Sequence, residues 1–362
     1  MNKKTVFLHI DWLLIIPVLV LIVLSLTTLL SINGSFFRNQ LLFSVLGSIL
    51  FIFFSQVNYR ILQSYKIPIY IASFIILFLL LIIGLESRNG AARWISFFGF
   101  AIQFSELLKP LLIIAFSAFL TTKEATSFKK FATAVLLLLP ITFFIYRQPD
   151  LGNALIYVLT AVSMLIFYGF PLRWFLSGFI GFLVIIPVSW RFLHQYQRDR
   201  LLTFFHLTND PLGTSYNAIQ SIIAVGSGGF LGKGFGQGTQ SALRFLPERQ
   251  TDFLFATFSE MFGFVGSLIV IIAFVILLYR LFVLIQVAED NFSKVFIAGA
   301  FSLISIQFFV NIGMNIGMLP IVGVTLPFMS YGGSSFIANC ILLGFVSSMG
   351  YKHKEKQVLE IR

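Results

Sequence analysis

Ten apolar runs, each close to the length that crosses a bilayer, constrain the fold of this chain more than any other feature. A helix of about 20 apolar residues spans the hydrocarbon core. The runs cover residues 12–31, 39–57, 67–84, 104–121, 131–147, 151–169, 172–190, 253–280, 294–316 and 325–349. Only 11% of the 362 residues are charged, whereas soluble domains carry about 25%. The sequence therefore predicts an all-α integral membrane protein with about ten transmembrane helices, forming a single polytopic domain over 1–362.

The basic residues indicate orientation in a membrane rather than binding of nucleic acid. The formal net charge is +11, but Lys and Arg are scattered over short segments between the apolar runs. Short cytoplasmic loops are enriched in these residues, whereas long loops cross the membrane regardless of charge. Most of the Lys and Arg fall on one side if the N-terminus is cytoplasmic. We therefore predict that both termini are cytoplasmic and that the long loop 191–252, between the seventh and eighth helices, is extracytoplasmic.

The long loop contains one segment with helical periodicity. Apolar residues between 217 and 225 fall on one face of a helix, and Gly226 can end it. Thr214 or Ser215 can cap its start. We expect this helix to lie on the membrane surface or against the helical bundle.

The glycine-rich segment 226–240 resembles a nucleotide-binding loop but fails its pattern. A phosphate loop needs Gly five residues before the Gly-Lys pair and Ser or Thr after it. Here Ser227 and Gly234 occupy those positions. Glycines still let backbone amides approach an anion, and Lys233 adds a positive charge. An anion-binding loop and a flexible linker both remain open. The single cysteine, Cys340, excludes a disulfide framework within the chain.

Asp252 lies where the long polar loop meets the eighth apolar run. Thr251 can cap that helix, which would place Asp252 in its first turn, where the helix dipole favours an ionised carboxylate. The alternative is an ordinary first-turn acid. Gln, Arg, Pro and Glu crowd the preceding positions, which favours a functional role.

Further charged residues lie within or beside the apolar runs, where each costs about 2.5–3.5 kcal/mol to insert and is a functional candidate by default. Glu106 and Lys109 are three residues apart and share a helix face, which also suits a purely structural ion pair. Asp150 begins the sixth run, as a cap or as a site residue. Glu260, two turns into the eighth run, faces the interior or pairs with Lys109. All of them lie toward the predicted outer side.

The last polar unit contains Asn311-Ile-Gly-Met-Asn-Ile-Gly317 and Leu326-Pro-Phe-Met-Ser-Tyr-Gly-Gly-Ser-Ser335. Gly and Pro that interrupt an apolar region indicate broken helices or close helix packing. Packing alone is the simpler interpretation of this unit.

Together these motifs resemble the SEDS family (shape, elongation, division and sporulation proteins), and within it the elongation-type RodA subfamily. The matching pieces follow the family order across nearly the whole chain. They are Ala92-Arg93-Trp94-Ile95, Gln103, Ser105-Glu106, Lys109, Gln148-Pro-Asp-Leu-Gly152, Gln220-Ser221, Gly226-Ser-Gly-Gly229, Gly232-Lys-Gly234, Gly238-Thr-Gln240, Phe245-Leu-Pro-Glu248, Thr251-Asp-Phe253, Asn311-Ile-Gly-Met314 and Leu326 to Ser335. One departure is Met261, because the family usually has a second acid next to the position of Glu260.

The resemblance implies a glycosyltransferase that polymerises lipid II into peptidoglycan strands at the outer face of the bacterial cytoplasmic membrane. It also implies a class B penicillin-binding protein, a transpeptidase, as partner, and no nucleic acid. Asp252 is carried over as catalytic. The positions carried over as substrate-binding are Arg93, Glu106, Lys109, Asp150, Gln220, Lys233, Glu248 and Thr251. No cofactor is certain, and a divalent cation is left open.

The chemistry sets further expectations. Glycosyl transfer needs a base and charge stabilisation for a departing lipid diphosphate. The cations available to that diphosphate, which the sequence does not rank, are Arg93, Lys109, Arg198, Arg200, Lys233, Arg244 and Arg249. A groove near the pair of Glu106 and Lys109 would admit the polyprenyl tail. The competing functions are a lipid II flippase and a non-catalytic scaffold. A flippase should present polar groups along the whole crossing, whereas here they gather on one side.

Overall fold

The structure is a bundle of long apolar helices with one short hairpin. The computed structural model describes residues 11–83, 94–97, 100–122, 126–189, 191, 198 and 215–360. The helices are α1 (Trp12–Ile32), α2 (Gly34–Gln56), α3 (Tyr59–Ser64), α4 (Lys66–Ile83), α5 (Phe104–Leu107), α6 (Lys109–Thr121), α7 (Phe128–Arg147), α8 (Leu151–Tyr168), α9 (Leu172–Ser189), α11 (Tyr216–Ser227), α12 (Thr239–Ala242), α13 (Leu254–Val287), α14 (Asn291–Asn315) and α15 (Gly333–Glu360). Strands β1 (Ile95–Phe97) and β2 (Phe100–Ile102) pair antiparallel.

The ten predicted runs all contain helices. In the described part of the chain, eight helical segments are long and apolar enough to cross a membrane, and α4 is a shorter apolar helix. The segments are α1, α2, the pair α5–α6, α7, α8, α13, α14 and the apolar part of α15. Helix α9 covers the seventh run. The prediction of a helical membrane protein is confirmed, while the count of ten spans stays a prediction.

Side-chain caps fix several helix starts. Asn33, Ser127 and Asp290 each accept a hydrogen bond from a backbone N–H in the first turn of α2, α7 and α14, which satisfies a donor that the helix leaves free. Gly169 ends α8 in the left-handed conformation, with φ of 99°. That conformation suits glycine and allows the tight turn into α9.

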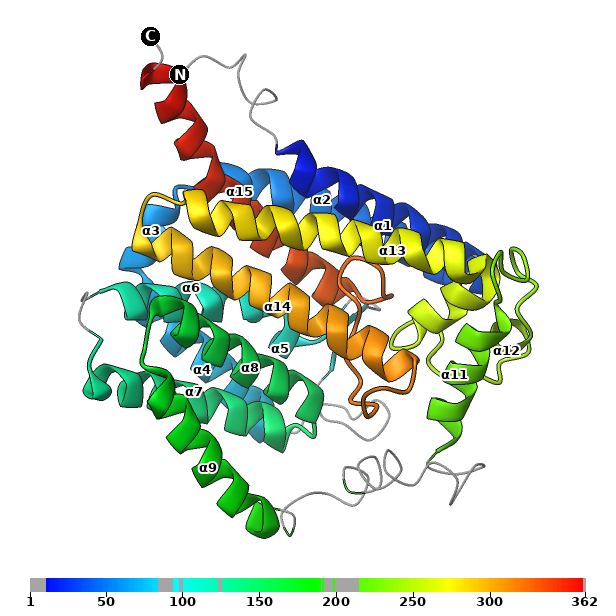
Figure 1. The fold of residues 1–362 in the computed structure, drawn as a ribbon, viewed down its shortest axis with the longest axis horizontal. Coiled ribbons are helices and arrows are strands. Elements are labelled where there is room, and N and C mark those ends of the chain that lie inside the picture. The colour runs from blue at the N-terminus through cyan, green and yellow to red at the C-terminus, as the bar shows by residue number, and fades with distance from the viewer. Residues whose placement is uncertain are drawn as a thin grey trace.

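Helix α14 lies at the centre of the bundle and packs on α13, α8, α6 and α15 (Figure 1). Large buried side chains such as Phe274, Phe296 and Phe345 fill the space around it. The start of α1 and the end of α15 lie at one end of the bundle, and α11 and α12 lie at the opposite end (Figure 1). The site described below is built at the end that carries α11 and α12.

Two predicted runs are interrupted. The tenth run starts at 325, but α15 begins only at Gly333, so 325–332 is not helical. Helix α13 is broken at Gly263, where φ is 65° and ψ is −159°. Both interruptions lie beside polar segments that supply the missing hydrogen bonds. Hydropathy alone does not predict such interruptions.

Candidate active site

Asp252 lies in a tight turn before α13 rather than in its first turn. The helix begins at Leu254, and the N–H groups of Thr251 and Phe253 both donate to the Glu248 carbonyl, at 3.1 and 3.3 Å. The Thr251 hydroxyl points back and donates to Glu248 Oε2 at 3.1 Å. The prediction that Thr251 caps the helix is therefore wrong, because its hydroxyl is engaged within the turn. Asp252 is half-buried, and Glu248 is exposed.

Two asparagines of α14 hold the backbone of this turn. The side-chain amides of Asn311 and Asn315 each donate to the Asp252 carbonyl at 3.0 Å. Asn315 Oδ1 also accepts from the N–H of Ala256 at 3.1 Å, which caps the start of α13. Both asparagines are 0% exposed. The interpretation of this motif as packing alone is incomplete. Two Asn residues four apart on an apolar helix share a face, and that signal could have identified them.

The non-helical segment before α15 supports the same turn. Ser330 Oγ donates to the Thr251 carbonyl at 2.7 Å, and the N–H of Tyr331 donates to the Gln250 carbonyl at 2.9 Å. Three residues of one turn, 250–252, are thus fixed by side chains or backbone from α14 and from the segment 325–332. The position of the Asp252 backbone is set by parts of the chain that lie far away in sequence.

The predicted ion pair between Glu106 and Lys109 is confirmed. Lys109 Nζ lies 2.7 Å from Glu106 Oε2, and the residues are 2% and 6% exposed. Asp150 lies nearby in the fold as the cap of α8. Its carboxylate accepts from the Asn153 backbone at 3.3 Å and from Gln103 Nε2 at 2.6 Å. Asp150 is therefore both a cap and a member of a buried polar cluster.

Gln103 connects this cluster to the Asp252 turn. Its side chain binds Asp150, while its backbone N–H donates to Ser334 Oγ at 2.9 Å. Ser334 follows directly on the segment that holds the Asp252 turn through Ser330. The short backbone segment from Ser330 to Ser334 thus links the Asp252 turn to the polar cluster around Asp150.

Glu260 pairs with Lys233 of the glycine-rich segment, not with Lys109. Lys233 Nζ lies 3.0 Å from Glu260 Oε1. The same carboxylate accepts from the N–H of Gln240 at 2.9 Å and from the N–H and hydroxyl of Ser241 at 3.0 and 2.9 Å. Glu260 is 0% exposed. The anion that this segment binds is therefore a carboxylate of the chain itself.

The glycine-rich segment also forms hydrogen bonds with the backbone groups at the break in α13. The N–H groups of Lys233 and Gly234 donate to the carbonyls of Glu260 and Met261, at 3.0 and 3.1 Å. The N–H of Phe264 donates to the Gly229 carbonyl at 2.9 Å. A Cβ at Gly228 or Gly232 would overlap the carbonyls of Ser259 or Met261. Glycine is needed because the two backbones touch, so the interpretation as a flexible linker is wrong.

Helix α11 packs against the bundle, one of the two predicted placements. It contacts α13 and α14, and Ser221 Oγ donates to the Asn315 carbonyl at 2.9 Å. The helix runs through Gly226 to Ser227, and Ser215 precedes it without a side-chain cap bond. Gln220 is half-buried beside Ser221. Thr214 and Arg93 lie outside the described residues.

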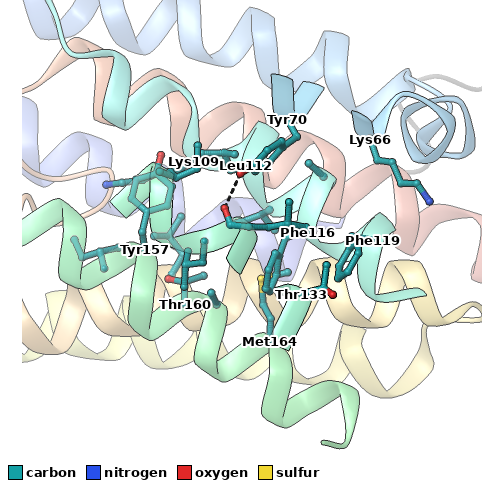
Figure 2. Close-up of a pocket in the computed structure, with 18 of the residues that line it drawn as sticks. Lys66, Tyr70, Lys109, Leu112, Phe116, Phe119, Thr133, Tyr157, Thr160 and Met164 are labelled. Carbon is teal, nitrogen blue, oxygen red and sulfur yellow. Dashed lines mark hydrogen bonds between the residues drawn. The ribbon is translucent and has the colours of Figure 1, made fainter. Parts of the chain in front are cut away.

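An elongated apolar cavity of about 360 Å³ begins at Lys109 (Figure 2). Residues of α4, α6, α7, α8 and α14 line it, most of them Leu, Ile, Phe and Ala. Lys109 and Tyr157 stand toward one end, and Lys66 and Phe119 toward the other (Figure 2). The position next to the Glu106–Lys109 pair agrees with the groove expected from the sequence.

No cluster of three His, Cys, Asp or Glu side chains suited to a metal ion occurs within the described ranges. The divalent cation stays an open prediction.

Comparison with known proteins identifies the family of the chain. The family of cell cycle proteins FtsW, RodA and SpoVE matches residues 3–355. Peptidoglycan glycosyltransferase MrdB of Escherichia coli (strain K12) is 35% identical over 367 residues, covering 99% of this chain and 98% of that protein. Stage V sporulation protein E of Bacillus subtilis (strain 168) is 35% identical over 356 residues, covering 92% and 95%.

Solved structures match over nearly the full length. A chain from a peptidoglycan synthase complex, described as coordinating polymerization and crosslinking, has a TM-score of 0.83 at 31% identity, covering 96% of this chain and 99% of that one. The Rod shape determining protein RodA of Thermus thermophilus has a TM-score of 0.72 at 27% identity, covering 95% and 97%. The chain therefore belongs to the FtsW, RodA and SpoVE family of cell cycle proteins, the SEDS family that its motifs resemble.

Proposed function

We propose that this chain is a peptidoglycan glycosyltransferase of the RodA type. It is a multi-pass protein of the bacterial inner membrane that polymerises lipid II into glycan strands at the outer face during cell elongation. Relatives that align over the full length are named peptidoglycan glycosyltransferases, which supports this activity. The observation that carries the proposal is the fixed Asp252 turn, which the segment 330–334 links to a buried polar cluster at one end of an apolar cavity.

In the proposed reaction, Asp252 accepts the proton of the attacking sugar hydroxyl. The hydroxyl oxygen bonds to the anomeric carbon of the donor sugar, and the bond from that carbon to the diphosphate oxygen breaks. The electron pair leaves with the lipid diphosphate. A base placed within hydrogen-bond reach of the proton that it removes contributes about 10²–10⁴-fold to such a step. Backbone anchoring by Asn311 and Asn315 supports this role, because it fixes the part of the chain from which the carboxylate projects.

The cavity suits the lipid part of the donor. A polyprenyl tail is apolar and needs an apolar channel next to the reacting centre. The lining side chains of α4, α6, α7 and α8 provide such a surface. Lys109, at the same end as the polar cluster, lies where a tail would join its charged diphosphate.

A class B penicillin-binding protein is the proposed partner. The structure with a TM-score of 0.83 is described as coordinating polymerization and crosslinking in one complex. Direct contact between the polymerase and the crosslinking enzyme would pass the glycan strand on at once. The strand would not have to diffuse along the membrane surface to reach the second enzyme.

The test is polymerisation of purified lipid II by the protein with its penicillin-binding partner, for wild type, Asp252→Ala and Asp252→Asn. Glycan strands from wild type and none from variants with an unchanged unfolding midpoint are expected. Equal product from all three would remove Asp252 from the chemistry. No product from wild type, together with lipid II transfer across vesicle bilayers, would replace the polymerase with the flippase.

A further inference from the structure

The glycine-rich segment 226–241 exposes large apolar side chains, although it belongs to the polar loop before α13. Phe230, Leu231 and Phe235 are 68%, 76% and 53% exposed. Single apolar side chains on a surface are common, but a group of them close together marks a surface that contacts another molecule or a membrane. These three residues lie within one short stretch of chain, and they form the patch considered below.

The patch lies beside the beginning of a transmembrane helix. The first eight residues of α13, 254–261, are all buried, so the helix does not form the surface of the bundle at this level. The N–H groups of Phe264 and Val265 donate to the carbonyls of Gly229 and Phe230, at 2.9 and 3.2 Å. The glycine-rich segment is thus fixed against α13 and belongs to the layer that covers its start.

The patch is continuous with the apolar surface that α13 presents beyond its break. Exposed apolar residues recur at helical spacing along one face of this helix. They are Phe264, Leu268, Ile272, Val275 and Tyr279. The ring of Phe230 stacks on the ring of Phe264, with the centroids 5.9 Å apart. The surface of a transmembrane helix therefore runs on into the glycine-rich segment through a direct contact between two apolar side chains.

The one charge of the segment is turned away from the patch. Lys233 is the single charged residue between 226 and 241. Its Nζ lies 3.0 Å from the buried carboxylate of Glu260 and donates to the Thr239 hydroxyl at 2.9 Å. Charged side chains at membrane depth turn to the protein interior and pair there. The pairing of Lys233 is what contact with hydrocarbon requires, whereas a lysine in water needs no partner.

We propose that residues 230–235 insert into the hydrocarbon of the membrane leaflet on the Asp252 side. Lipid acyl chains cover the patch, because it continues a transmembrane surface and its one charge is paired inside the protein. The insertion makes this part of the loop a membrane anchor, as apolar side chains do in proteins that lie in the interface of a bilayer. The inference goes beyond the proposed function and does not depend on it.

Insertion fixes the height of the Asp252 turn above the hydrocarbon. The N–H of Gly234 donates to the Met261 carbonyl at 3.1 Å, so the inserted residues lie beside Met261. A helix rises about 1.5 Å per residue, which places the start of α13 at Leu254 about 10 Å farther along the axis. The headgroup layer is about 5–7 Å thick on each side of a bilayer. The Asp252 turn therefore stands just beyond that layer, level with a sugar that a lipid carries. This last consequence alone rests on the proposed function.

The experiment measures the surroundings of single nitroxide labels in the purified protein, reconstituted into phosphatidylcholine vesicles at a low ratio of protein to lipid. Collisions of each label with oxygen, which concentrates in hydrocarbon, are compared with collisions with a nickel chelate, which stays in water. The native Cys340 is buried, so the unsubstituted protein serves as the blank for labelling. Unfolding midpoints are measured for every labelled protein.

Four positions carry the label in turn. Leu231→Cys and Phe235→Cys report on the patch. Val275→Cys, on the exposed face of α13, is the reference for contact with lipid. Leu243→Cys is the matched control, because Leu243 is also an exposed leucine of the same loop but precedes the exposed Arg244.

We expect the ratio of oxygen to nickel collisions at Leu231→Cys to agree with that at Val275→Cys within about twofold, because hydrocarbon excludes polar solutes at both positions. The ratio at Leu243→Cys should be lower by about fivefold or more, because the chelate reaches a label in water. Phe235→Cys should resemble Leu231→Cys, and it decides the question if the Leu231→Cys protein does not fold.

Three results would overturn the assignment. The first is a ratio at Leu231→Cys no higher than that at Leu243→Cys, which would place the patch in water with the rest of the loop. The second is protection of the Leu231→Cys label from both reagents, which would indicate burial against protein. The third is spin–spin broadening between labels at this position, which would show that a second copy of the chain covers the patch. No lipid II is present, so each result holds whether or not the protein polymerises it.

Discussion

Asp252 and Glu260 are two carboxylates eight residues apart that the fold treats in opposite ways. Asp252 is half-buried, and the hydrogen bonds from Asn311 and Asn315 go to its backbone carbonyl. Glu260 is fully buried, and Lys233, Gln240 and Ser241 donate to its side chain. A carboxylate saturated by donors of its own chain organises structure, because its charge is already compensated. Asp252 instead lies on a fixed backbone in a turn that is partly open to solvent, where another molecule can reach it.

The largest expected effect concerns Asp252. Asp252→Ala should reduce lipid II polymerisation by about 10²–10⁴-fold, the contribution of a well-placed base. The unfolding free energy should fall by no more than about 1.5 kcal/mol, less than for Glu260→Ala, because the bonds from Asn311 and Asn315 go to the backbone and survive. Glycan product and thermal unfolding in detergent check both halves. A large loss of stability would show that the Asp252 carboxylate, like that of Glu260, mainly stabilises the fold.

Glu260→Ala should act in the reverse direction. It should lower the unfolding free energy by about 3 kcal/mol or more, because it leaves Lys233 and the donors of the glycine-rich segment without their acceptor. Lys233→Met removes one donor among several and should cost about 1.5 kcal/mol. Denaturant unfolding in detergent gives both values. If Glu260→Ala kept full stability yet lost polymerisation, the carboxylate would be acting on substrate and the comparison would fail.

The glycine-rich segment gives a matched pair of backbone tests. Gly232→Ala should cost about 2 kcal/mol of stability, because its φ is 86° and the added methyl would overlap the Met261 carbonyl. Gly226→Ala lies in α11 with open space around it and should be neutral or stabilising by up to about 1 kcal/mol. Equal effects from the two variants would show that the contact with the broken helix does not matter.

The smallest expected effect tests the anchoring of Asp252. Asn315→Leu should lower kcat for polymerisation about tenfold, or about 1.4 kcal/mol, while KM for lipid II changes little, since a misplaced base affects the transition state more than binding. Gln307→Leu is the control. Gln307 is buried two turns earlier on the same helix, and its side-chain amide has no hydrogen-bond partner among the described residues. A general packing effect would instead lower kcat in both variants alike.

The residue next to Glu260, Met261, departs from what the family resemblance predicts. Met261 stands where the resemblance to the family leads us to expect a second acid. In this chain it is buried, and Ser31 Oγ lies 3.0 Å from its sulfur. The neighbouring Glu260 already binds Lys233, so one carboxylate is enough to satisfy the donors of the glycine-rich segment. This arrangement explains how the position can hold an apolar side chain without leaving a donor unsatisfied.

The sequence by itself determined the features that depend on short-range chemistry. Apolar runs of bilayer length predicted the helices, because hydropathy is a local property. The spacing of three residues predicted the pair of Glu106 and Lys109, because such residues share a helix face. Asp150 before an apolar run indicated either a cap or a site residue, and the structure shows the cap. The resemblance to a known family added the activity and singled out Asp252.

Only the tertiary structure decided the partners that lie far apart in the chain. Asn311 and Asn315 reach the Asp252 carbonyl across 59 and 63 residues, and Gln103 reaches Ser334 across 231. It also decided that Glu260 binds Lys233 rather than Lys109 and that Gly263 breaks α13. Several donors and carboxylates were available to each group, and local spacing cannot choose among them. The choice was made by helix packing, which buries each polar group only where a partner can satisfy it.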